Sequence, residues 1–340
     1  MIARALGGLA LCALSGAAMA TPTYTILDFD GLDGWATDDH AAALDVFVQT
    51  CGDIPRPDWR RLCTFAKDGP PARDFFETFF LPVLIEDGSP MLFTGYYEPE
   101  LNGDLAPSES FTHPLLRLPP LGLEGQFSRR EIDEGAFADQ GLEIAWIDDP
   151  VDLFFLQVQG SGRIRLPDGR VIRVGYAGKN GRDYSSIGMA LVDRGIFTAG
   201  EVSAQTIRDW VRDNPEEGRA LLWQNESYVF FREVSEVPAE LGPLGAMNRS
   251  ITAGRTIAVD PEITILGAPV WIEKDGDDPM RRLMIAQDTG SAIKGAQRAD
   301  IFFGTGPEAG RAAGNVKDGG RMVVLMPVDY ALSKIESPER

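Results

Sequence analysis

Apolar residues along this chain follow two periods, one typical of helices and one typical of strands. Between positions 40 and 52 the apolar side chains recur every three to four residues, which places them on one face of a predicted helix. Those residues are Leu44, Phe47, Val48 and Cys51. Asp38 or Asp39 is expected to cap the N-terminus of this helix, and Gly52 to end it.

Two further stretches near the N-terminus also show helical spacing. DWRRLC turns Trp59, Leu62 and Cys63 inward. In DFFETFFLPVLIED, Pro82 is expected to bend or end the helix. Its apolar face comprises Phe76, Phe79, Phe80 and Val83. The following MLFTGYYEPEL is predicted to be a strand that runs into a Pro-Glu turn.

From about residue 100 to 235 the pattern changes to short strands, the clearest being a hairpin in RIRLPDGRVIRVGY that turns at Pro167–Gly169. Helices are expected at 186–196 and at 203–213, where Ser203 is the cap. After about residue 241 strands return as nearly continuous apolar runs, typical of a barrel or sandwich core. These are TIAVD, APVWIEK, RRLMIAQD, ADIFFG and RMVVLMP. The layout indicates a middle segment inserted into a discontinuous outer domain.

The first twenty residues, MIARALGGLALCALSGAAMA, have the pattern of a secretory signal peptide. An Ala-x-Ala site predicts cleavage before Thr21, which would release a soluble periplasmic protein. An outer-membrane lipoprotein is less well supported, because the bulky Leu11 precedes Cys12 where a small residue is expected. No later apolar run is long enough to span a bilayer, so no firm membrane anchor is expected.

Cleavage would leave two cysteines, Cys51 and Cys63, in a compartment that permits disulfides. Both lie on the inward faces of predicted N-terminal helices. We therefore expect them to be bonded to each other, the alternative being two buried free thiols.

Charge and composition exclude several classes of partner. The formal net charge of −19 repels phosphate backbones and anionic membrane surfaces, so nucleic acid is not an expected partner. The two histidines, His40 and His113, do not stand at metal-ligand spacing. Neither a metal nor another cofactor is expected.

Known catalytic motifs are represented only by near misses. Asp288–Ser291 reads DTGS, as in the aspartic-peptidase turn, but that chemistry needs a second such turn and the sequence has none. FFGTGPEAG spaces its glycines one residue too widely for the dinucleotide-binding fingerprint. What remains is carboxylate chemistry.

Three aspartates stand at the ends of predicted strands. Asp260 and Asp288 close two of them, and Asp300 opens a third. A single acid in such a position usually caps a turn, but three in a glycine-rich stretch with few other acids indicate a site. A carboxyl group in apolar surroundings keeps its proton at neutral pH and can donate it to a leaving oxygen, as glycosidic cleavage requires.

Six blocks stand in order from about Leu92 to Pro327: FTGYYEPEL, FFLQVQGSGRI, GYAGKNGRDYSSIG, GRTIAVDPEITILGAPVWIE, AQDTGSAIKGAQRADIFFGTGPEAGRAAG and GRMVVLMP. Together they resemble the MltA family of lytic murein transglycosylases, and the C-terminal third is similar to its 3D domain, named for three aspartates. The resemblance implies a mainly β fold with a helical N-terminal segment. It combines a double-psi β-barrel (21–99 and 236–335) with a smaller inserted β-barrel (100–235), with a groove between them and a flexible tail at 336–340.

The resemblance also implies a reaction on peptidoglycan glycan strands. The β-1,4 bond between N-acetylmuramic acid and N-acetylglucosamine is cleaved without water, leaving a 1,6-anhydro end, and Asp300 matches the family's single acid/base. Asp288 and Asp260 match the other two aspartates, which are expected to hold loops or tune Asp300. The alternatives are a non-catalytic peptidoglycan-binding protein and a hydrolytic glycosidase in which Asp288 is the second acid. Protein partners in the cell-wall machinery stay open.

Expected glycan contacts are of two kinds. Polar groups that bind N-acetyl and hydroxyl groups are Gln157, Gln159 and Ser161, with Glu98 as a further candidate. Aromatic rings that stack on sugar faces are Tyr96, Tyr97, Tyr176 and Tyr184, although each ring is also a candidate core residue.

Overall fold

The computed structural model describes residues 21–336, so the signal peptide expected at 1–20 lies outside the described residues. Of the tail expected at 336–340, Glu336 is the last residue of a helix, and the other four residues also lie outside.

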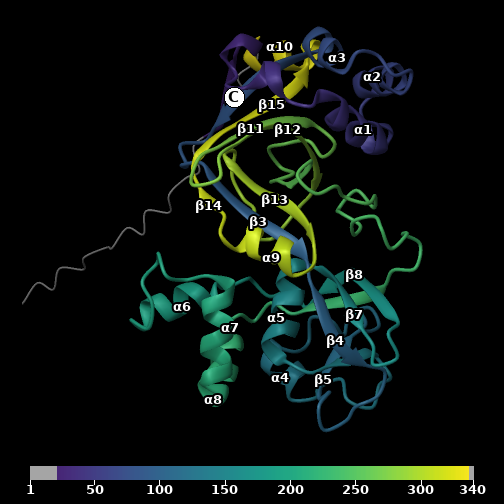
Figure 1. Cartoon of the computed structure of the whole chain (residues 1–340), viewed down its shortest axis with the longest axis vertical. Helices are drawn as coiled ribbons and strands as arrows, with labels where there is room; N and C mark the ends of the chain where they lie inside the picture. Colours follow the sequence, from purple (N-terminus) through teal and green to yellow (C-terminus); the bar gives the residue numbers. More distant parts are fainter. Residues whose placement is uncertain (1–20, 337–340) are drawn as a thin grey trace, which may run out of the picture.

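The strands form two separate sheets (Figure 1). The larger sheet contains β1 (Thr23–Ile26), β2 (Phe80–Glu86), β3 (Leu92–Glu98), β10 (Thr256–Ala258), β11 (Pro269–Lys274), β12 (Met280–Asp288), β13 (Arg298–Thr305), β14 (Lys317–Asp318) and β15 (Gly320–Pro327). Its order is β1-β2-β15-β11-β12-β10-β13-β3-β14. The smaller sheet contains β4 (Glu100–Asp104), β5 (His113–Leu116), β6 (Glu143–Ile147), β7 (Ser161–Arg165), β8 (Val171–Lys179) and β9 (Val229–Glu233). Its order is β5-β6-β4-β7-β8-β9.

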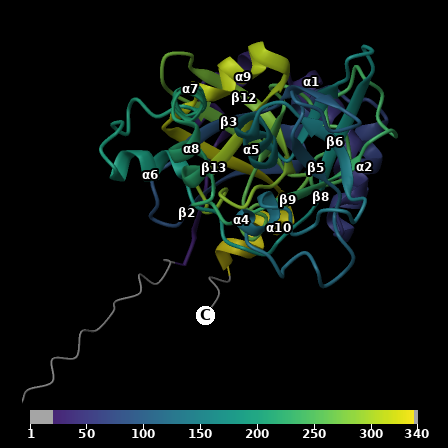
Figure 2. The same ribbon diagram turned by 90° about the horizontal axis from the view of Figure 1, so that it is seen from below.

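Helices cluster in the N-terminal segment and beside the smaller sheet. The N-terminal ones are α1 (His40–Thr50), α2 (Pro57–Lys67) and α3 (Ala72–Phe79), with 3-10 turns at Phe29–Gly31, Trp35–Thr37 and Cys51–Asp53. The middle ones are α4 (Arg129–Asp133), α5 (Pro150–Gln159), α6 (Ile187–Asp193), α7 (Ala204–Asp213) and α8 (Pro215–Leu222). The late ones are α9 (Gly306–Gly314) and α10 (Val328–Glu336). Helices α6, α7 and α8 lie to one side of the smaller sheet in both views (Figures 1 and 2).

The smaller sheet is built entirely from residues 100–233, whereas the larger sheet takes its strands from the segments before and after that stretch. The fold is therefore mixed and sheet-rich with a helical N-terminal segment, which confirms the predicted fold class. We propose 21–99 with 236–335 and 100–235 as the domain limits, because the two sheets separate between β3 and β4 and between β9 and β10.

Helix α1 is capped as its sequence predicts, and the N-terminal helices pack through their apolar faces. Asp39 caps α1, accepting a hydrogen bond from the Ala42 backbone N–H (3.1 Å). The apolar faces meet in a fully buried aromatic cluster. It comprises Phe47, Trp59, Phe75, Phe76 and Phe80. Packing of these faces stabilises helices too short to persist alone.

The prediction that helical structure extends as far as Val83 was wrong. Helix α3 ends at Phe79, and Phe80–Glu86 forms β2, which pairs antiparallel with β15 and with β1. Phe80 and Val83 are both buried, as a helical face would also require. The apolar spacing of this segment therefore fits either a helix or a strand. The segment forms a strand because it pairs with β1 along one edge and with β15 along the other.

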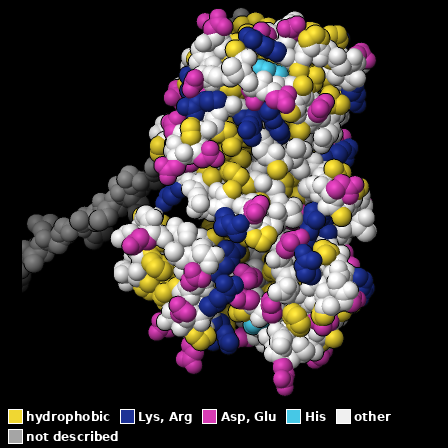
Figure 3. Space-filling model, viewed as in Figure 1, with side chains coloured by type: hydrophobic (Ala, Val, Ile, Leu, Met, Phe, Trp, Pro, Cys, Tyr) yellow, Lys and Arg dark blue, Asp and Glu magenta, His cyan; other side chains and the backbone are white. Residues whose placement is uncertain are grey.

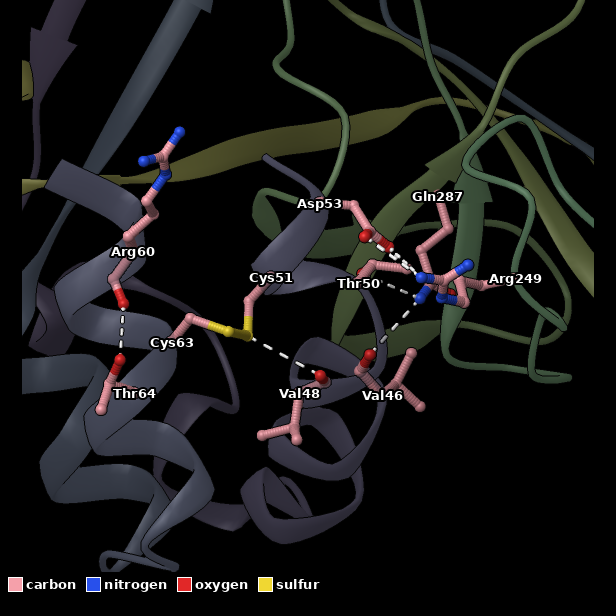
Figure 4. Close-up of a disulfide and its surroundings, with 10 residues drawn as sticks. All are labelled: Val46, Val48, Thr50, Cys51, Asp53, Arg60, Cys63, Thr64, Arg249 and Gln287. Carbon is pink, nitrogen blue, oxygen red and sulfur yellow. Dashed lines mark hydrogen bonds and ion pairs between the residues drawn. A yellow bond between two sulfur atoms is a disulfide. The ribbon is translucent and has the colours of Figure 1, made fainter. Parts of the chain in front are cut away.

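Cys51 and Cys63 form a disulfide that joins the end of α1 to α2 (Figure 4). Beside it, Arg249 forms an ion pair with Asp53 (3.0 Å), which ties the 3-10 turn after α1 to the loop before β10. The N-terminal segment is thus fastened both within itself and to the larger sheet.

The middle segment contains more helix than the sequence analysis predicted. The helices expected at 186–196 and 203–213 are present as α6 and α7, with Ser186 and Ser203 as caps. Helix α5, by contrast, was not predicted. Its signals are nevertheless in the sequence: Asp149 caps its N-terminus, Pro150 occupies the first turn, and Gly160 ends it at a left-handed φ of 79°.

Candidate active site in the groove between the sheets

A pocket of about 790 Å³ lies between the two sheets. One wall comes from β3, β12 and β13 together with the loop after β12. The opposite wall comes from the end of α5, from β7, β8 and β9, and from the loops beside them. Asp300 and Asp288 both line the first wall.

Asp300 lies on an interior strand, where its backbone is flanked by Ala258 of β10 and Thr94 of β3. The Thr94 hydroxyl donates a hydrogen bond to Oδ1 of Asp300 (2.6 Å) and accepts one from the Arg298 guanidinium (2.8 Å). Thr94 therefore stands between Asp300 and the nearby cation. No ion pair within 4.0 Å joins Asp300 to a Lys or Arg among residues 21–336.

Burial raises the pKa of Asp300 above its usual value, while the hydrogen bond from Thr94 and the positive charge of Arg298 act in the opposite direction. The residue is only partly exposed, and it faces the pocket. A carboxyl group in this environment keeps its proton to a higher pH than an exposed aspartate does, and it can release that proton to a bound group.

Asp288, the last residue of β12, is held by three donors. Its Oδ2 accepts a hydrogen bond from the Tyr96 hydroxyl (2.8 Å), and its Oδ1 accepts from the backbone N–H groups of Ala246 (3.0 Å) and Thr289 (2.9 Å). Burial nevertheless raises the pKa of Asp288 to about 6, and the charge of Asp300 adds to this rise. The two acids stand on the strands that flank β10, and the charge of Asp300 reaches Asp288 across it.

Two glutamines that the sequence analysis missed hold the acid-bearing strands in place. Gln287, next to Asp288, donates to the Val46 carbonyl (3.3 Å) and the Thr50 hydroxyl (3.1 Å) of α1 (Figure 4). It also accepts from the Thr256 hydroxyl (2.6 Å). These contacts pin the end of β12 to the N-terminal helix. The signal was an amide directly after the apolar run LMIA, since such a group must find partners when buried.

The second glutamine, Gln297, stands three residues before Asp300. It donates to the Ile85 and Met322 carbonyls (2.8 and 2.9 Å) and accepts from the Met322 backbone N–H (3.0 Å). It therefore fixes the start of β13 against β2 and β15.

Asp260 does not line the pocket. It is buried, and its carboxylate accepts from the backbone N–H groups of Gly295 (3.0 Å) and Glu262 (3.2 Å) and pairs with Lys294 (3.3 Å). Of the three aspartates, the structure brings two together in the pocket and uses the third to hold a loop.

Most of the predicted glycan contacts line the pocket. They are Gln157, Gln159, Ser161, Tyr96, Tyr176 and Tyr184. Tyr97 lies outside the lining, and its hydroxyl accepts a hydrogen bond from Arg208 (3.2 Å). Tyr96 and Gln159 already have protein partners, since Gln159 accepts from the Tyr97 backbone N–H (2.9 Å).

The structure contradicts a glycan contact for Glu98. Its side chain is completely buried, between Arg163 (2.9 Å) and Arg173 (3.0 Å), and it also accepts from the Thr305 hydroxyl (2.7 Å). Glu98 therefore joins the end of β3 to the smaller sheet and has no surface left for a sugar.

Within residues 21–336, no group of three or more His, Cys, Asp or Glu side chains is placed to hold a metal ion. A search of the same residues found no helix long and apolar enough to cross a membrane.

Comparison with known proteins gives consistent results for both halves of the chain. The family model of the MltA specific insert domain matches residues 121–232, and that of the 3D domain matches residues 255–326. A crystal structure of membrane-bound lytic murein transglycosylase from Agrobacterium tumefaciens is 35% identical, with a TM-score of 0.82, covering 92% of this chain and 99% of that chain. MltA from Neisseria gonorrhoeae, in its monoclinic form, is 34% identical, with a TM-score of 0.76, covering 91% and 94%.

Two proteins of Escherichia coli complete the comparison. The curated membrane-bound lytic murein transglycosylase A of strain K12 is 39% identical over 240 residues, which are 68% of this chain and 65% of that relative. The chain thus spans a little under two thirds of that relative's length. A crystal structure of E. coli MltA with bound chitohexaose is 30% identical, with a TM-score of 0.74, covering 89% and 94%.

Fold and site together define a class of protein with two sheet-based halves and a pair of half-buried acids in the groove between them. Within that class, the chain belongs to the MltA family.

Proposed function

We propose that this protein is a lytic transglycosylase, a lyase that cleaves the β-1,4 bond between N-acetylmuramic acid and N-acetylglucosamine in peptidoglycan and leaves a 1,6-anhydro end. The observation that carries the proposal is Asp300: a partly exposed carboxyl group in the pocket, with its pKa raised by burial and no direct cationic partner among the described residues. Membership of the MltA family gives independent support.

The reaction needs one carboxyl group because the nucleophile belongs to the substrate. Protonated Asp300 donates its proton to the leaving O4 as the bond from the anomeric carbon to O4 breaks. The C6 hydroxyl of the same muramic acid then bonds to the anomeric carbon, and the Asp300 carboxylate takes up the hydroxyl proton. The acid is restored, and no water is consumed.

Asp288 has a supporting part in this proposal. Its three hydrogen bonds fix it in the same pocket as Asp300, across β10, and the negative charge of Asp300 disfavours ionisation of Asp288. Asp288 therefore helps to keep one proton in the pair, and Asp260 acts at a distance by holding the loop that leads into β13.

We propose that the opposite wall binds the glycan strand. Tyr176 is 54% exposed and offers a ring for stacking on a sugar face. The side-chain oxygen of Gln157 is buried and has no hydrogen-bond partner within residues 21–336, so it can accept from an N-acetyl N–H group. We also propose a periplasmic location, on the basis of the signal pattern in residues 1–20.

The test is digestion of purified sacculi followed by mass analysis of the released muropeptides. Asp300→Asn is expected to lower the rate of release by about 10²- to 10⁴-fold, the range typical of a lost general acid/base. Asp278→Asn, an exposed position in the turn before β12, is the matched control and should retain full activity. Full activity of Asp300→Asn would move the acid elsewhere, and binding without release by the wild type would favour a non-catalytic protein.

A further inference from the structure

The pocket wall opposite the two acids carries only positive charge. Asp288 and Asp300 are the only acids among the described lining residues, and both belong to the larger sheet. The wall contributed by the other half of the chain contains Arg129, Lys179 and Arg232 and no Asp or Glu. Because the chain has 51 acidic and 32 basic residues, a cationic wall is not what its composition would place there.

The three cations on this wall differ in what they are free to bind. Arg129 is buried and donates to the backbone carbonyls of Asn225 and Ser227, so it holds a loop. Arg232 is paired with Glu236 (2.7 Å). Lys179 is partly exposed in the pocket and has no side-chain hydrogen bond or ion pair within residues 21–336.

The basic residues on α7, outside the pocket, do not share this property. Figure 3 shows Lys and Arg side chains in a band over α7. Both α7 arginines are engaged by acids: Arg208 pairs with Asp152 (2.9 Å), and Arg212 pairs with Asp149 (2.7 Å) and Asp152 (2.8 Å). Positive charge in that band is therefore largely neutralised, whereas the Lys179 ammonium is not.

The register of β8 and β9 places Lys179 beside the exposed ring of Tyr176. Lys179 lies opposite Val229 and Tyr176 lies opposite Phe231, positions two residues and about 7 Å apart along β9, because the strand bulges between Tyr176 and Gly178. Arg232 lies opposite Gly175 and lines the same wall. The wall therefore presents an exposed aromatic ring together with two cations, all three on β8 and β9.

We propose that Lys179, with Arg232 in support, is a specificity-determining residue that binds carboxylate groups carried by the glycan strand. This inference rests on the proposed function and deepens it, because it names the residue that binds the carboxylates of that substrate. In peptidoglycan the carboxylate has two sources: the lactyl ether of muramic acid when the strand lacks peptides, and the acidic residues of the stem peptide when it carries them.

The test measures binding in the Asp300→Asn background, where the ligand stays intact. Three probes are compared by calorimetry: peptide-bearing glycan strands, strands freed of peptides by an amidase, and the neutral hexamer of N-acetylglucosamine. Lys179→Met is expected to weaken binding of at least one acidic probe by about two- to five-fold at low salt and to leave the neutral hexamer unchanged. Added salt should shrink the difference, because it screens charges in water.

Two variants are controls: one keeps a positive charge at position 179, and the other removes a positive charge elsewhere on the surface. Lys179→Arg should restore binding of the acidic probe, and Lys67→Met, an exposed position on α2, should have no effect. Weakening confined to peptide-free strands assigns the contact to the lactyl carboxylate, and weakening confined to peptide-bearing strands assigns it to the stem. Equal weakening of the neutral hexamer, or no effect on either acidic probe, would overturn the proposal.

The outcome is separable from that of the proposed reaction. If the wild type releases no 1,6-anhydro product but Lys179→Met still weakens binding of acidic strands selectively, the lyase proposal fails and the carboxylate contact stands.

Discussion

Thr94 allows Asp300 to lie close to a guanidinium group and still hold a proton. Its hydroxyl receives the hydrogen bond from Arg298 and passes one on to Asp300, so the cation is not paired directly with the acid. Both contacts lower the pKa of Asp300, and burial raises it more strongly. Residue 94 is therefore the position at which the proton affinity of Asp300 can be changed without touching the acid.

Thr94→Val should raise the pKa of Asp300 further, because the variant loses the hydroxyl that stabilises the carboxylate. The reaction needs protonated Asp300, whose fraction falls as pH rises through its pKa. The alkaline limb of the kcat/KM profile should therefore move to higher pH in Thr94→Val and stay in place in Thr94→Ser. An unchanged limb in the valine variant would show that another group controls the profile.

At the scale of single residues, the sequence predicted the two acids of the pocket better than the residues around them. Asp288 and Asp300 were predicted as a pair, and they share one pocket. Glu98 was misassigned because its partners, Arg163 and Arg173, are 65 and 75 residues away, and no local pattern indicates such a contact. Thr94 was missed for the same reason, since it meets Asp300 across 206 residues.

Among the secondary-structure elements, α1 links the N-terminal segment to the site. It is held at its end by the disulfide and by the contacts of Val46 and Thr50 with Gln287. Gln287 precedes Asp288, so the position of α1 is transmitted to the end of β12. The disulfide therefore stabilises a helix on which the site depends.

Replacing both cysteines, as Cys51→Ala with Cys63→Ala, should lower the free energy of unfolding by about 3 kcal/mol, because the bond closes a short loop with a sequence separation of 12 residues. The measurement is urea unfolding of both proteins with and without a reductant. Wild type in reductant should approach the double variant, and the double variant should not respond to reductant. Equal stability of the two oxidised proteins would contradict a stabilising bond.

The sequence predicted the helices and strands whose capping residues and apolar periodicity lie within the element itself, such as α1, α7 and the β7–β8 hairpin. Helix α5 was overlooked although Asp149, Pro150 and Gly160 mark both of its ends, because its nearly continuous apolar run has no clear period. The parallel pairing of β3 with β13, which places Thr94 beside Asp300, has no sequence signal at all.

In the molecule as a whole, Glu98 is the main ionic connection between the two sheets. It lies at the end of β3, and its partners Arg163 and Arg173 stand on β7 and β8 of the smaller sheet. The groove lies between these sheets, so its width depends on how firmly they are joined. The insertion of one segment into another could be predicted from the change in pattern along the chain, but the contact that fixes their relative position could not.

Glu98→Gln should lower the free energy of unfolding by about 3–5 kcal/mol, because it leaves two buried or partly buried arginines without their carboxylate. Glu100→Gln is the matched control, since its ion pair with Arg165 is largely exposed and should contribute at most about 1 kcal/mol. Chemical denaturation of the three proteins measures both effects. A loss at Glu98 no larger than that at Glu100 would show that the buried network does not hold the sheets together.

The central claim is that Asp300 serves a reaction whose nucleophile belongs to the substrate. Digestion of sacculi in water enriched in oxygen-18, followed by mass analysis of the released sugars, tests it most directly. We predict 1,6-anhydro ends that contain no oxygen from the solvent. Reducing ends that carry one labelled oxygen at the anomeric carbon would instead identify a hydrolase and contradict the account.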